Sequence, residues 1–238
     1  MRFFRPSLFF IANVILASQA FSVVEVSPDI ILKKADEVRN PSESFQMTAS
    51  VANADSQIPT VFSVAMKGKD KTLIKTLEPA RDKGRNLLML GEEMWAYIPN
   101  LKRALRVSLN QKLTGQAANG DLSRMRWYGD YAAKIEKESA QDWILLLIAN
   151  KKGLTYDKVR ATIAKNTFRP LKAEYLSLGG KSLKVAEFGG YKSIAGEVRP
   201  TEIVIQDTHN SAERSVITIQ AMELTDFPES YFTQDNLK

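Results

Sequence analysis

The residue types that most often perform catalysis are scarce in this chain. It has 238 residues, with one histidine and no cysteine. The histidine, His209, lies in the polar stretch 207–211, whose composition is typical of a hairpin turn. A Ser–His–Asp site would have to use His209, and no nucleophile-elbow, zinc-protease, calcium-loop or phosphate-loop motif is present. We therefore predict no enzymatic activity, no catalytic residue, no metal site and no cofactor.

The side chains that stand out are apolar and aromatic, and they lie in one strand pair. Residues 87–90 and 94–98 are apolar at every position, and the turn between them carries the polar residues. A strand with one face in water alternates apolar and polar residues, because successive side chains point to opposite faces. Both faces of this pair must therefore meet a core, a covering helix or a ligand.

Aromatic and methionine side chains at strand positions suit the binding of apolar groups. Trp95 and Tyr97 share one face of their strand, and methionine adapts to variable acyl shapes. Burying a 16-carbon acyl chain is worth on the order of 10 kcal/mol, at roughly 0.8 kcal/mol per CH₂. We predict a ligand-binding hydrophobic cavity lined by Phe62, Val64, Met66, Leu88, Leu90, Trp95 and Tyr97. The alternative is that these residues form an ordinary core.

A helix and a sheet are needed to position these side chains. Between Pro28 and Arg39 apolar residues recur at helical spacing, and Pro41 follows the end of this pattern. From residue 45 onward the pattern has a period of two, which predicts about ten or eleven strands. Strands do not alternate with helices, so the sheet is expected to be antiparallel. We predict a mainly β (α+β) fold with the N-terminal helix on the concave face of a curved sheet.

The segment 110–130 breaks the strand pattern. It holds Gly115, Gly120 and Gly129, and then the cluster Met125-Arg126-Trp127-Tyr128. A connection of this length in a β domain is usually functional or mobile.

The first 20 residues resemble a secretion signal. Arg2 and Arg5 precede a short apolar run, and small residues occupy the cleavage positions Ser18 and Ala20. We predict a cleaved signal peptide at 1–20, a single mature domain at 21–238 and a periplasmic location. Without cysteine the mature chain has no site for lipoprotein acylation. The formal net charge is +6, but no basic stripe or motif indicates nucleic-acid binding.

One stretch carries a family resemblance. Its elements are Pro79, Lys83-Gly84, Leu87-Leu88-Met89-Leu90, Met94-Trp95-Ala96-Tyr97-Ile98-Pro99, Arg103 and Arg106-Val107-Ser108. This run resembles the outer-membrane lipoprotein-sorting (LolA/LolB-like) superfamily, in particular the branch of uncharacterised homologues found beside RND/MMPL-type exporters. The compact G-S-D motif of that branch is not seen in the 120–130 loop. The resemblance implies an incomplete antiparallel β-barrel of about 11 strands, with a helical lid over a cavity for acyl chains.

These observations predict a monomeric periplasmic carrier that shuttles a lipid or lipoprotein between membranes. Its expected partners are acyl chains, an inner-membrane RND/MMPL-type transporter and, transiently, a membrane surface. A first alternative is an exporter adaptor that carries no lipid and docks through Arg103, Arg106 and the 110–130 loop. A second is a hydrolase that uses a carboxylate pair in the same cavity.

Overall fold

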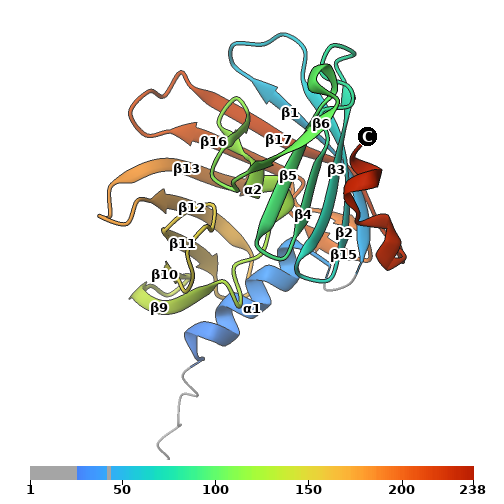
Figure 1. The fold of residues 1–238 in the computed structure, drawn as a ribbon. Helices are drawn as coiled ribbons and strands as arrows, with labels where there is room; N and C mark the ends of the chain where they lie inside the picture. The colour runs from blue at the N-terminus through green and yellow to red at the C-terminus, as the bar shows by residue number, and fades with distance from the viewer. Residues whose placement is uncertain (1–25, 42–43) are drawn as a thin grey trace, which may run out of the picture.

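The computed structural model describes residues 26–41 and 44–238, and one large antiparallel sheet dominates it (Figure 1). Thirteen strands form this open sheet. In order across it they are β6 (Arg103–Val107), β5 (Glu93–Ile98), β4 (Leu87–Leu90), β3 (Lys71–Glu78), β2 (Thr60–Lys67), β1 (Phe45–Asn53), β17 (Arg214–Leu224), β16 (Glu202–Asp207), β13 (Ser182–Gly189), β12 (Pro170–Leu176), β11 (Lys158–Ala164), β10 (Asp142–Ala149) and β9 (Tyr131–Glu138).

The sheet consists of two meanders that meet at its centre. β1 to β6 form one meander, β9 to β13 with β16 and β17 form the other, and β1 pairs with β17 between them. The two edges, β6 and β9, are not paired with each other, so the barrel is incomplete as predicted. The sheet has thirteen strands rather than about eleven.

Helix α1 (Pro28–Arg39) has the predicted bounds and lies on the inner face of the sheet (Figure 1). The Ser27 side chain caps its first turn and Pro28 occupies the first helical turn, where the missing N–H costs nothing. Ile31, Leu32 and Ala35 are fully buried against the sheet. No helix in the described ranges is long and apolar enough to cross a membrane.

The segment between β6 and β9 folds back into the concave side of the sheet. It forms a small hairpin, β7 (Lys112–Thr114) with β8 (Ala117–Ala118), and the short helix α2 (Asn119–Ser123). A Cβ added to Gly120 would lie 1.8 Å from the Thr155 hydroxyl oxygen, so only glycine fits this contact. The segment that we predicted to be functional or mobile is therefore packed inside the fold. A second small hairpin, β14 (Lys192–Ile194) with β15 (Glu197–Arg199), lies beside α1.

The outer face of the first meander is covered by the C-terminal segment. This segment contains two 3₁₀ turns, η2 (Glu229–Tyr231) and η3 (Gln234–Leu237). Phe232 and Leu237 are buried, and they pack with Leu88 and Trp95 in an apolar cluster separate from the main core. Both faces of the β4–β5 pair are thus covered by protein.

Candidate functional site

A small cavity with apolar walls lies beside α1, along the polar side of the helix that carries Lys33, Asp36 and Glu37, and we call it the lid cavity. Its volume is about 160 Å³, and it lies between α1, the turn after β2 and residues 123–128. Phe45, Met66 and Met125 supply apolar wall. Pockets for organic ligands usually measure about 300–1,000 Å³. A long acyl chain therefore enters only if α1 or the 123–128 segment moves outward.

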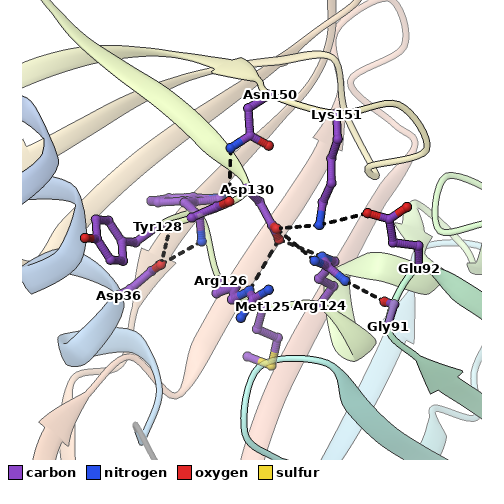
Figure 2. Close-up of polar contacts among 12 residues, drawn as sticks. Asp36, Gly91, Glu92, Arg124, Met125, Arg126, Tyr128, Asp130, Asn150 and Lys151 are labelled. Atoms are coloured by element: carbon purple, nitrogen blue, oxygen red, sulfur yellow. Dashed lines mark hydrogen bonds and ion pairs between the residues drawn. The ribbon is translucent and has the colours of Figure 1, made fainter.

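Polar side chains of α1 hold the helix against residues 125–128 (Figure 2). The Asp36 carboxylate accepts hydrogen bonds from the backbone N–H groups of Trp127 at 2.7 Å and Tyr128 at 2.6 Å. The Asn40 amide donates to the Met125 carbonyl at 2.9 Å. Burial raises the pKa of Asp36, although the nearby Arg39 and the two backbone N–H groups act in the opposite direction. Three hydrogen bonds thus connect the predicted lid to the loop below it.

A second polar network is centred on Asp130 (Figure 2). Arg124 donates two hydrogen bonds to the Asp130 carboxylate, at 2.6 and 2.8 Å, and a third to the Gly91 carbonyl at 2.8 Å. Lys151 lies 3.2 Å from Asp130 and 3.3 Å from Glu92. Burial alone would raise the pKa of Asp130, but the Arg124 hydrogen bonds and the surrounding cations lower it. The network joins the β4–β5 turn to the β10–β11 turn, across the open side of the sheet.

The seven residues predicted to line the cavity divide between the two faces of the sheet. Phe62, Val64 and Met66 are buried in the main core on the inner face, and Met66 lines the lid cavity. The other four pack on the outer face with the C-terminal segment: Leu88, Leu90, Trp95 and Tyr97. As a ligand-binding set the seven remain a prediction. The sequence indicated which residues share a face, but alternation does not indicate which face is the concave one.

A second cavity, of about 560 Å³, opens at the β6 side of the sheet. Phe62 and Tyr97 both border it, and they are the two predicted lining residues that share a cavity. Polar side chains, among them Arg85, Asn86 and Lys112, make up much of its wall. This composition suits an acyl chain less well than the lid cavity.

Several residues of the lid cavity were missed by sequence reasoning. Phe45 lies in the first predicted strand, Asp36 lies within the predicted helix, and Asn40 lies just past the end of that helix. The Met125-Arg126-Trp127-Tyr128 cluster was noticed, but its place beneath α1 depends on contacts between residues about 90 positions apart in the chain.

The other residues that the sequence singled out lie on the surface. His209 is in an exposed turn next to Asp207, and Arg106 pairs with Glu93 on β5. Among the residues that the structure describes, no three histidine, aspartate or glutamate side chains gather as metal ligands would.

The fold and sequence match proteins of known structure. A crystal structure of a LolA superfamily protein from Nitrosomonas europaea is 36% identical, and the match covers 89% of this chain and 100% of that chain with a TM-score of 0.83. The chain belongs to the LolA superfamily. A family model described only as an uncharacterized protein matches residues 68–238. No curated protein matches the chain.

Two more distant structures share the LolA-like fold. One is a putative outer membrane lipoprotein-sorting protein domain from Vibrio parahaemolyticus, 21% identical over 88% of this chain and 97% of that chain, with a TM-score of 0.72. The other is a DUF1329 family protein from Desulfovibrio piger, 19% identical over 89% of this chain and 98% of that chain, with a TM-score of 0.75. The open sheet and inner helix of this LolA superfamily chain are therefore a shared architecture, and its lid cavity is the feature to interpret.

Proposed function

We propose that this LolA superfamily protein is a periplasmic carrier that binds the acyl chains of a lipid or lipoprotein between α1 and the inner face of the sheet. The observation that carries the proposal is the lid cavity, which has apolar walls and is bordered by a helix held by polar contacts. The Vibrio relative, described as a putative lipoprotein-sorting domain, supports the same class of cargo. Binding of this kind needs no catalytic residue.

The energies of lid opening and acyl binding are similar in size. Lifting α1 exposes Ile31 and Leu32, at about 1.5–3 kcal/mol each. It also breaks three hydrogen bonds to the 125–128 segment and the hydrogen bond that Arg199 donates to the Glu37 carbonyl, worth about 1 kcal/mol each. A 16-carbon chain that fills the opened space returns on the order of 10 kcal/mol. The closed lid is thus stable without cargo, and an acyl chain of this length stabilises an open one.

The proposal extends to the route of the cargo. We propose that an inner-membrane transporter of the RND/MMPL type delivers or receives the lipid during a transient membrane contact, and that the carrier is a monomer. The proposed signal peptide at 1–20 lies outside the described residues, and 21–238 would be the mature single domain. The adaptor alternative makes no use of an acyl cargo.

Native mass spectrometry with lipid extraction tests the carrier proposal. Mature protein purified from its periplasm should carry an acyl-bearing adduct at a stoichiometry near one. Met66→Gln places a polar amide in the cavity wall and should remove the adduct. Trp95→Ala, on the outer face, is the matched control and should retain it. A protein that stays free of lipid after incubation with membrane extracts would contradict the carrier and favour the adaptor.

A further inference from the structure

The rim of the lid cavity carries more basic than acidic side chains. Its charged lining residues are Lys33, Lys69, Arg124, Arg126, Asp36 and Glu37. Arg124 is already bound to Asp130 and Gly91, and Asp36 to two backbone N–H groups. Of the remaining charged groups, Lys33, Lys69 and Arg126 are cationic, whereas Glu37 and the Asp36 Oδ1, which accepts no hydrogen bond in the described residues, are anionic.

Arg126 lies beside the cavity with an incompletely used guanidinium group. Its Nη1 is buried and has no hydrogen-bond partner among the described residues, while its Nε lies 3.4 Å from Asp130. Asp130 does not depend on that long contact, because Arg124 and Lys151 already bind it. A buried donor without a partner is costly, and a guanidinium group pairs well with a carboxylate or a phosphate. Arg126 can therefore pair with an anion in the cavity mouth once a change of its side-chain rotamer exposes this group.

Two lysines flank the same mouth from opposite elements. Lys33 is exposed on α1, and Lys69 is exposed in the turn between β2 and β3. Within the described ranges neither forms an ion pair, and the Lys69 amine lies 5.9 Å from the centre of the Tyr128 ring. Glu37, also exposed on α1, is the acidic group that opposes them. The mouth thus places two exposed lysine amines next to the apolar wall formed by Phe45, Met66 and Met125.

We propose that the cargo is an anionic amphiphile, whose acyl chain lies in the lid cavity while its carboxylate or phosphodiester group binds Arg126, with Lys33 and Lys69 around it. This inference rests on the proposed carrier function and specifies the ligand class. A neutral lipid would leave the Arg126 donor unpaired. A free inorganic anion would leave the apolar wall without a partner.

Two ligands with the same hydrocarbon chain but different head groups separate the contribution of the charge to binding from that of the hydrocarbon chain. Oleate and oleyl alcohol, both delivered from cyclodextrin at pH 8, are titrated against the mature protein and followed by tryptophan fluorescence. Wild-type protein should bind oleate at least about tenfold more tightly than oleyl alcohol, as expected for one charge-assisted hydrogen bond. Inorganic phosphate, an anion without a chain, should not bind in the same range.

Variants assign the charge preference to the cavity mouth. Arg126→Gln should reduce the preference for oleate to within about threefold and leave oleyl alcohol binding unchanged, and Arg126→Lys should restore part of it. The double variant Lys33→Gln/Lys69→Gln changes only exposed side chains, so it remains informative if Arg126→Gln does not fold. It should weaken oleate binding about threefold. Lys34→Gln is the matched control, since Lys34 lies over the Phe168 ring rather than in the lid cavity.

The outcomes distinguish this inference from the carrier proposal. Equal binding of oleate and oleyl alcohol would overturn the anionic cargo and leave the carrier intact. A lack of binding by both would contradict the carrier itself. Micromolar binding of inorganic phosphate, lost in Arg126→Gln, would indicate an anion site without an acyl cargo and would also overturn the inference.

Discussion

Replacement of Asp130 by asparagine tests the network that crosses the open side of the sheet. The side chains of Asp130 and Arg124 are 1% and 3% exposed, so the pair is buried. Asp130→Asn preserves the shape but removes the charge that Arg124, Arg126 and Lys151 share. Removing one partner of a buried ion pair costs about 3–5 kcal/mol, because the other charge stays buried without compensation. For a protein of this size, that loss lowers Tm by about 6–20 °C.

The pH dependence of stability gives this prediction a second readout. The pKa of Asp130 is lowered in the folded protein. Its contribution is therefore fully present above the ordinary pKa of an aspartate, and it is lost as the pH falls through the lower folded value. Wild-type stability should decrease on this acidic limb, and the Asp130→Asn variant should show a shallower decrease. Urea unfolding between pH 3 and 7 measures both curves.

Hydrogen exchange locates the same effect in the structure. Because Arg124 binds the Gly91 carbonyl and Lys151 reaches Glu92, loss of Asp130 should increase exchange at the β4–β5 and β10–β11 turns together. Asp82→Asn is the control, since Asp82 pairs at the surface with Arg81 and Arg85, and it should change stability by less than about 1 kcal/mol. A loss below about 1 kcal/mol in Asp130→Asn, or an increase at one turn alone, would refute the reasoning.

Three further substitutions test other parts of the fold. Trp95→Ala should lower the free energy of unfolding by about 1–3 kcal/mol and leave acyl binding unchanged, because Trp95 packs under the C-terminal segment. Weakened acyl binding would instead indicate that Trp95 lines the acyl-binding cavity. Gly120→Ala should destabilise the protein by about 1–3 kcal/mol in urea unfolding, and adding Thr155→Ala should recover part of the loss, whereas a neutral single variant would contradict the close contact. Asn40→Ala removes the hydrogen bond to Met125 and, at about 1 kcal/mol, should speed stopped-flow acyl entry about fivefold; an unchanged rate would mean that α1 is not the lid.

The sequence predicted those parts of the fold that depend on local pattern. The bounds of α1 follow from proline at its start, apolar spacing and Pro41 after its end, and the structure confirms them. The placement of Trp95 and Tyr97 on one face of their strand is also confirmed, since both lie in the outer apolar cluster, whereas Met94 and Ala96 lie in the main core. In both cases the signal lies within a few consecutive residues.

The parts that could not be predicted depend on partners distant in the chain. The 110–130 segment has no period, and its position is set by contacts such as that of the Thr72 hydroxyl with the Ser123 carbonyl. The outer-face role of Leu88 and Trp95 depends on where the last 14 residues dock, which strand alternation does not encode. The sequence around Asp36 is that of an ordinary polar helix position, because its hydrogen-bond partners Trp127 and Tyr128 come about 90 residues later in the chain.

The pairing of β1 with β17 has a consequence for how the chain is made. The two central strands come from opposite ends of the polypeptide, with Phe45 opposite Leu224 and Asn53 opposite Ser215. Closing so long a loop carries an entropic cost before any contact compensates for it, and sheets built from distant segments fold slowly. The middle of this sheet cannot form until the last strand has left the ribosome. Within each meander, by contrast, most paired strands are neighbours in the sequence, so their contacts are available before the central pair closes.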